Sequence, residues 1–335
     1  MKFLNGIWVK RLGNILTVAS LAFIVWKLFN LELKISSFHN SWPRLIICAL
    51  IAQIPAILGV ALNSRAWQFF LETLSKRKLN FWEVFHIYAK ANIGKYLPGN
   101  VMHFVERNLF ATSHGLGQLE TLTSTLMEIL SQLLAALIIS VALAFPQLKS
   151  FISQSLTWNR SLIVLFLLLA SGAVMVLIYR NSARVREITA CACTLSFARA
   201  FVIGTFFYAL SFAANCLTIL LALYSIEPLD DLTNLPLIFA MNTLAWLVGF
   251  VTPGAPGGLG IREFVLVTMA SSTPFSQIIL IAAVSQRFVM IAADFLAYLL
   301  GNFLFRPPLP EPSSPGTSNA NNSTNSEECT KTSIC

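Results

Sequence analysis

Long apolar runs separated by short polar connections dominate the chain. A helix needs about 20 mostly apolar residues to cross the hydrocarbon core of a membrane. Runs of about this length cover residues 12–30, 45–62, 119–145, 162–179, 200–224 and 277–305. The pattern therefore predicts six membrane-spanning helices.

Two further apolar regions, residues 81–113 and 236–273, are interrupted in the middle. The interruptions read YLPGN over residues 96–100 and TPGAPGGLG over residues 252–260. Because proline and glycine stop helices, each region is either one kinked span or a re-entrant hairpin of two half-helices. A hairpin is tolerated at membrane depth only where protein or a wet cavity surrounds its bare backbone.

The order span, span, broken region, span occurs twice, starting near residues 12 and 162. We therefore expect an all-α polytopic membrane protein with six spans and two re-entrant hairpins, built as an inverted repeat. Residues 1–145 form membrane repeat 1, and residues 146–305 form membrane repeat 2. Eight plain spans, two of them kinked at proline, are the alternative.

Composition agrees with a membrane protein. Hydrophobic residues make up 56% of the chain and charged residues 11%, against about 45–50% and about 25% in soluble proteins. The mean hydropathy is +0.70. This balance cannot cover the surface of a large soluble catalytic domain, which excludes that class.

The net charge of +8 reflects membrane topology and not nucleic-acid binding, because basic residues mark the cytoplasmic side of membrane proteins. They gather in alternate connections, at Lys2, Lys10, Arg11, Arg65, Lys76, Arg77, Lys78, Arg180, Arg184, Arg186 and Arg199. The intervening connections hold Lys34, Arg44, Lys149 and Arg160, and the acids Glu227, Asp230 and Asp231. Both termini are therefore predicted to be cytoplasmic, in a cytoplasmic (inner) membrane of bacterial or archaeal type.

The two ends of the chain differ from the middle. Residues 1–30 have a basic start and an apolar core without a clean cleavage site, which predicts a retained span and not a signal peptide. Residues 306–335 are rich in proline, serine and asparagine, a composition typical of a disordered tail.

The interrupted regions carry the most distinctive motifs, GKYLPGNVMHFVER over residues 94–107 and TPGAPGGLGIRE over residues 252–263. They resemble the two signature segments of the flippase-like transmembrane family found in lysylphosphatidylglycerol synthases, a YxPG element followed by an arginine and a PGGLGxRE element. The resemblance covers everything except the tail. It implies translocation or scrambling of an anionic or polyprenyl-linked membrane lipid in envelope biogenesis. The soluble aminoacyl-transferase domain of the bifunctional members is absent, which argues against aminoacyl transfer.

The residues at the breaks themselves predict an anion site. Glycines allow close backbone approach, and a half-helix following each break points its partly positive N-terminus at it. Arg107 and Arg262 lie on these half-helices and suit phosphate, unless they snorkel or pair with Glu106 and Glu263. Glu263 is also a candidate for orienting an arginine. The candidate substrate-binding residues are Tyr96, Pro98, Gly99, Asn100, His103, Arg107, Pro256, Gly257, Gly258, Gly260, Arg262 and Glu263.

Other ionisable residues stand inside apolar runs, at Glu120, Glu128, Arg287 and Asp294. A charge at the centre of a spanning helix costs about 2.5–3.5 kcal/mol on insertion scales, so these side chains should face the interior. Arg287 and Asp294 are seven residues apart and share a helix face, which predicts a structural ion pair. A proton-coupling role for Glu128 or Asp294 is the functional alternative.

The sequence contains no GxxxxGK[ST] phosphate loop, so ATP is not expected to drive this chain directly. We expect no catalytic residues, metal site, cofactor or nucleic-acid partner. Two rival functions stay open. One is a polyprenyl-phosphate-dependent glycosyltransferase using Glu227, Asp230 and Asp231; the other is a non-transporting subunit of an envelope-assembly complex. Besides the membrane lipid, the partners we expect are further copies of the chain or proteins of envelope biosynthesis.

Overall fold

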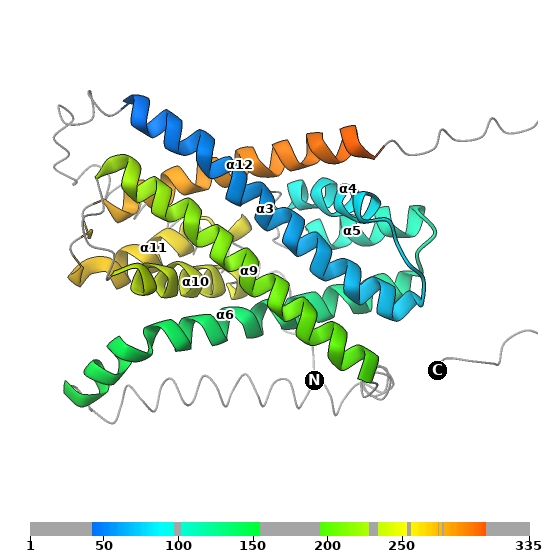
Figure 1. The fold of residues 1–335 in the computed structure, drawn as a ribbon, viewed down its shortest axis with the longest axis horizontal. Helices are drawn as coiled ribbons and strands as arrows, with labels where there is room; N and C mark the ends of the chain where they lie inside the picture. Colours follow the sequence, from blue (N-terminus) through cyan, green and yellow to red (C-terminus); the bar gives the residue numbers. More distant parts are fainter. Residues whose placement is uncertain are drawn as a thin grey trace, which may run out of the picture.

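The computed structural model describes residues 42–96, 102–154, 195–227, 234–252, 256–273, 275–276 and 278–305. All regular structure in these ranges is helical (Figure 1). The elements are α3 (Trp42–Ser75), α4 (Phe81–Asn92), η1 (Ile93–Tyr96), α5 (Met102–Ser113), α6 (Gln118–Gln154), α9 (Leu195–Ile226), α10 (Leu235–Val251), η3 (Pro256–Gly258), α11 (Ile261–Met269), η4 (Ala270–Ser272) and α12 (Ile279–Leu304). The all-α prediction is confirmed.

Four helices in the described part are long and apolar enough to cross a membrane: α3, α6 over Gln118–Leu143, α9 over Ser196–Ile226, and α12. They match four of the six predicted spans. The other two predicted spans, residues 12–30 and 162–179, lie outside the described residues, as does the predicted tail. The chain is a multi-pass membrane protein.

The outward faces of these helices agree with a lipid surrounding. Large apolar side chains are exposed on all four, for example Ile54 on α3, Ile138 on α6, Phe206 on α9 and Phe303 on α12. Water would not favour so much exposed apolar surface on one monomer. Lipid chains can cover it, which suits a protein whose helices pack around a polar interior.

Helix α3 extends well beyond its predicted end at Leu62, to Ser75. The additional turns bury Ala66, Trp67, Phe70 and Leu71, a spacing that places them on one side of a helix. Arg65, predicted to lie in a connection, is therefore part of the helix. It donates from Nη1 to Gln68 Oε1 at 2.7 Å.

Both interrupted regions form hairpins of two short helices. The halves are 12, 12, 17 and 9 residues long, and at 1.5 Å per residue each is shorter than the roughly 30 Å hydrocarbon core. Helix α4 packs against α5, and α10 packs against α11. These contacts favour the hairpins over the alternative of eight plain spans.

Helices α3 and α9 lie side by side and run in opposite directions (Figure 1). Near the start of α3, Arg44 donates from Nε to Ser225 O at 3.1 Å and from Nη2 to Ile226 O at 2.9 Å, at the end of α9. Further along, Ser211 Oγ donates to Gly59 O at 3.3 Å.

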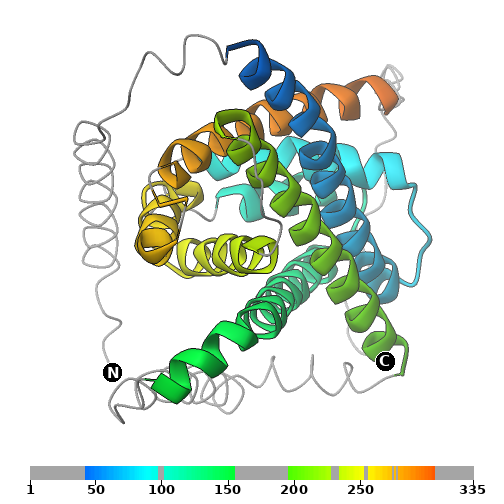
Figure 2. The same cartoon turned by 60° about the vertical axis from the view of Figure 1, so that its left-hand side comes forward.

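The order long helix, short helix, break, short helix, long helix occurs twice, as α3 to α6 and as α9 to α12. The contacts between helices follow the same duplication. Helix α12 packs on α3 and α4, and α6 packs correspondingly on α9 and α10. Figure 2 shows these helices arranged around a common interior. The short helices η1 and η3, one from each half, are in contact.

Candidate functional site

A polar cavity of about 160 Å³ is lined by Lys95 of η1, beside the first break, and by Gly257 of η3, in the second break. A cavity needs roughly 10–15 Å³ on this measure to hold one water, so the space admits a group considerably larger than water. Its walls come from both halves of the chain, from α3 to α6 and from α9 to α12. The cavity therefore belongs to neither half alone.

The second break is built from glycines in the left-handed region. Gly257, Gly258 and Gly260 have φ values of 56°, 71° and 82°, which residues with a Cβ adopt only under strain. A Cβ on Gly257 would lie 3.7 Å from the carbonyl oxygen of Lys95 in the first break. The second break therefore lies against η1, the segment that leads into the first break.

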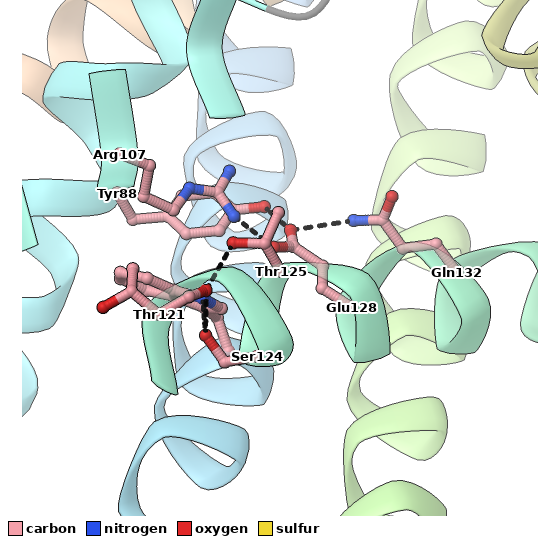
Figure 3. Close-up of polar contacts among 8 residues, drawn as sticks. Tyr88, Arg107, Thr121, Ser124, Thr125, Glu128 and Gln132 are labelled. Atoms are coloured by element: carbon pink, nitrogen blue, oxygen red, sulfur yellow. Dashed lines mark hydrogen bonds and ion pairs between the residues drawn. The ribbon is translucent and has the colours of Figure 1, made fainter. Parts of the chain in front are cut away.

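The first buried ion pair joins Arg107 of α5 to Glu128 of α6 (Figure 3). Both side chains are 1% exposed. Glu128 Oε1 also accepts hydrogen bonds from Tyr88 Oη at 2.8 Å and from Gln132 Nε2 at 3.2 Å. The carboxylate therefore has three donors, and the local pair of Arg107 with Glu106 that the sequence left open is not needed to balance the guanidinium.

Aromatic rings enclose the Arg107 guanidinium. Its Cζ lies 4.0 Å from the ring centre of Tyr88, 5.1 Å from Trp67 and 5.6 Å from Phe104. Trp67 is itself fixed, because its Nε1 donates to Ser124 Oγ on α6 at 2.9 Å. Cation–π attraction of this kind is strongest where the cation has lost its water. These surroundings favour a structural role for Arg107 over a phosphate-binding one.

The second ion pair joins Arg287 of α12 to Glu263 of α11, with Nε at 3.0 Å from Oε1. Arg287 Nη1 also donates to Gly257 O at 2.9 Å. Glu263 Oε2 accepts from Gly260 N at 2.8 Å at the start of α11. Glu263 thus orients Arg287, as the sequence suggested for this residue. It also accepts a hydrogen bond from the Gly260 amide at the N-terminus of α11, where the sequence predicts that an external anion binds.

The third ion pair joins Lys95 of η1 to Asp294 of α12, with Nζ at 2.5 Å from Oδ2. Asn92 Nδ2 donates to the other carboxylate oxygen at 2.6 Å. The predicted pairing of Arg287 with Asp294 is therefore wrong. The two residues share a face of α12, but each is closer to a different break, and each binds a partner there.

Arg262 occupies a slot between two glycines. A Cβ on Gly249 would lie 2.5 Å from Arg262 Cγ, and one on Gly258 would lie 2.7 Å from Arg262 Nε. The guanidinium lies over Trp246, with Cζ 5.8 Å from the ring centre. Trp246 stacks on Phe250 and meets Phe212 edge-on. The slot directs this side chain into the cavity wall at the second break.

The ionisable residues that line the cavity carry an excess of positive charge. The cations are Lys95, Arg107, Arg262 and Arg287, and the carboxylates are Glu128, Glu263 and Asp294. His103 adds no charge, because burial, Arg107 and Lys95 together lower the pKa of this imidazole on the non-spanning helix α5 to about 3. A ligand with one negative charge would balance the lining.

Of the predicted site residues, those brought to the cavity are His103, Arg107, Glu128, Gly257, Arg262, Glu263, Arg287 and Asp294. Gly258 and Gly260 shape the adjoining backbone. Pro98, Gly99 and Asn100 lie outside the described residues, and the side chains of Tyr96 and Pro256 are likewise not described. Glu120 lies in the first turn of α6 and does not line the cavity.

The sequence reading missed several lining residues. Lys95 lies in the motif over residues 94–107 but was assigned no role. Nothing in the sequence around Gly249 indicated that this glycine makes room for Arg262. Six amide side chains also line the cavity: Asn63, Asn92, Gln132, Asn215, Asn242 and Gln286. Asparagine and glutamine inside apolar runs are therefore, like ionisable residues, a sequence signal for positions that line a polar cavity.

A family model described as the lysylphosphatidylglycerol synthase TM region matches residues 14–296. The matched range includes both breaks and every described helix except the end of α12. No curated protein matches the chain.

Proposed function

The chain belongs to the lysylphosphatidylglycerol synthase transmembrane family, and we propose that it moves an anionic lipid between the leaflets of a cytoplasmic membrane. The headgroup passes through the cavity between the two breaks while the acyl chains stay in the surrounding lipid. The observation that carries the proposal is this positively biased cavity, lined by residues of both halves, inside an apolar helical protein.

Arg262 is the residue that we assign to the headgroup. Arg107 is 1% exposed and enclosed by rings, and Arg287 is bound to Glu263 and to Gly257 O. Arg262 is held by the slot of Gly249 and Gly258 at the edge of the second break. An arginine guanidinium offers the paired donors that phosphate oxygens accept.

We further propose that the two halves are inverted repeats, with both termini on the cytoplasmic side. The antiparallel course of α3 and α9, and the matched contacts of α6 and α12, support this arrangement. In transporters built from inverted repeats, substrate sites lie at the repeat interface, and one repeat moves against the other. The ion pair of Lys95 with Asp294 joins the first half to the second and would have to adjust during such movement.

The proposal is tested by reconstituting the full chain into liposomes that contain fluorescent phosphatidylglycerol and measuring the fraction of label reached by a membrane-impermeant quencher. The wild type should make inner-leaflet label accessible. Arg262→Ala should abolish this exchange, because it removes the guanidinium that we assign to the headgroup, while Arg287 stays bound to Glu263 and Gly257 O. Arg262→Lys should restore it only in part, because an ammonium keeps the charge without the bidentate geometry.

Arg199→Ala is the matched control, because Arg199 is an exposed arginine of α9 outside the cavity. It should exchange lipid at the wild-type rate. Wild-type exchange by Arg262→Ala would remove the site from this region, and equal rates for Arg262→Lys and wild type would remove the phosphate argument. A wild-type protein that moves no anionic lipid would overturn translocation and favour a non-transporting role.

A further inference from the structure

Amide side chains line the cavity from several helices of both halves. They come from α3 (Asn63), α4 (Asn92), α6 (Gln132), α9 (Asn215), α10 (Asn242) and α12 (Gln286). An uncharged amide in an apolar helix is costly to bury unless it is hydrogen-bonded. Amides without a hydrogen-bond partner in the protein therefore indicate which chemical groups a ligand in the cavity would present.

Three of the amides are already used by the protein. Asn92 donates to Asp294, Gln132 donates to Glu128, and Gln286 Nε2 donates to Thr218 Oγ1 at 2.8 Å. These side chains fix carboxylates or tie α12 to α9. They are part of the framework of the cavity.

The other three amides, Asn63, Asn215 and Asn242, make no side-chain hydrogen bond with any residue that the structure describes. Asn242 is only 9% exposed. His103, 8% exposed, has a buried Nδ1 without a hydrogen-bond partner in the described part of the chain. Their donors and acceptors therefore remain for a group inside the cavity.

The position of these amides relative to Arg262 is defined by α10. Asn242 and Trp246 are four residues apart and share a face of that helix, and Arg262 lies over Trp246. An anionic group at Arg262 thus has Asn242 one helical turn away. Asn215 lies near the same space from α9, with Nδ2 3.9 Å from where a Cβ on Gly59 would be.

We propose that Asn242, with Asn63, Asn215 and His103, forms a subsite for the hydroxyl groups of a phosphodiester lipid headgroup, either glycerol or a ring polyol. Each amide offers both donors and acceptors, which matches a hydroxyl group that donates and accepts. The single excess positive charge of the lining fits a phosphodiester, which carries one negative charge. This inference rests on the proposed function and narrows its substrate class.

The test compares lipids with equal charge and different hydroxyl content. Fluorescent phosphatidylglycerol, phosphatidylinositol and phosphatidylpropanol all carry one phosphodiester charge, but phosphatidylpropanol has no headgroup hydroxyl. In liposomes with the full-length protein, at least one hydroxyl-bearing lipid should exchange on the order of tenfold faster than phosphatidylpropanol. The reason is that a site built to bind hydroxyls leaves its polar groups unpaired with the analogue. If phosphatidylglycerol exchanges faster than phosphatidylinositol, the subsite fits glycerol; if phosphatidylinositol is faster, it fits a ring polyol.

Asn242→Leu, Asn215→Leu and Asn63→Leu keep the side chain branched at Cγ, with a somewhat larger volume, and remove the amide. Each should bring the rate ratio towards one, mainly by slowing the hydroxyl-bearing lipid, while exchange of phosphatidylpropanol persists as evidence of a folded protein. Asn302→Leu, at an exposed asparagine of α12 outside the cavity, should keep the wild-type ratio.

A wild-type ratio near one would overturn the subsite and leave lipid translocation standing. A large ratio that all three amide variants retain would also overturn it, since other residues would then select the hydroxyls. Equal slowing of all lipids in all three variants would show that the amides serve only the fold. If the wild type moves none of the lipids, translocation fails, and the subsite fails with it.

Discussion

Arg107 and Glu128 form a buried ion pair, which allows two charges to lie inside an apolar helical protein. Neither side chain has access to solvent, so each charge depends on the other and on Tyr88 and Gln132. Breaking a buried pair by removing one partner leaves an uncompensated charge, which is much more costly than removing both. The pair is therefore expected to matter to stability more than to lipid recognition.

Arg107→Met should lower the free energy of unfolding by about 3–5 kcal/mol, because Glu128 then keeps a buried charge without its counter-ion. Adding Glu128→Gln should recover part of the loss, since the amide oxygen still accepts from Tyr88. Thermal unfolding of the purified variants in detergent measures both effects. A double variant as unstable as the sum of the two single changes would show that the two residues are not coupled.

Gly249 gives a second prediction at the residue scale. A Cβ there would lie 2.5 Å from Arg262 Cγ, so Gly249→Ala should displace the Arg262 side chain and slow lipid exchange. In an Arg262→Ala background, the same change should cost almost no stability, because the obstructing side chain is gone. Melting temperatures of the four proteins in this cycle test it. A stability loss that is unchanged in the Arg262→Ala background would contradict the slot.

At the scale of elements, α12 connects both breaks through residues on one face. Arg287 binds Glu263 and Gly257 at the second break, while Asp294 binds Lys95 and Asn92 at the first. Seven residues correspond to about 10.5 Å along a helix, which separates Arg287 from Asp294 along α12. A single helix thereby sets the positions of two segments that are far apart in the sequence.

Reversing the charges of Lys95 and Asp294 tests this connection. Lys95→Asp or Asp294→Lys alone places like charges together and should lower the melting temperature. The double reversal should restore part of the loss, with a coupling energy of about 0.5–3 kcal/mol, as is usual for interacting pairs. A double variant without any recovery would mean that Asp294 is held mainly by other neighbours.

The sequence predicted the elements better than their partners. Four spans and both breaks follow from run length and from proline and glycine, which are local properties of the chain. The length of α3 beyond Leu62 was missed, because Asn63 and Arg65 interrupt an apolar run that tertiary packing nevertheless completes. The partner of Asp294 was also missed, since helical periodicity gives the face of a helix and not what lies opposite that face.

At the scale of the whole molecule, the matched contacts of the two halves relate the cavity to the proposed transport. Each half supplies a hairpin, and the last long helix of each half, α6 or α12, packs on the hairpin of the other half. A relative movement of the halves would therefore change the cavity from both sides. Glu128 on α6 is paired with Arg107, and Asp294 on α12 is paired with Lys95. A proton-coupling role for either carboxylate therefore requires its ion pair to open during the movement.

The antiparallel arrangement of α3 and α9 allows the predicted membrane orientation to be tested at three positions on these helices and their connections. Arg44 contacts Ser225 and Ile226, so the start of α3 and the end of α9 lie on the same side of the molecule. The other end of α3 leads into Lys76, Arg77 and Lys78. If basic connections are cytoplasmic, the first side faces outward and the second faces the cytoplasm.

In a variant without native cysteines, Trp42→Cys and Leu229→Cys should therefore react with a membrane-impermeant thiol reagent applied to intact cells. Arg77→Cys should react only after the membrane is opened, because α3 is long enough to span and a spanning α3 would have its ends on opposite sides of the membrane. Restoring Cys329 alone tests the predicted cytoplasmic C-terminus in the same way. Labelling of Arg77→Cys in intact cells would reverse the orientation. Labelling of position 42 without position 229 would contradict the shared side of α3 and α9, and labelling of Cys329 in intact cells would contradict the inverted repeat.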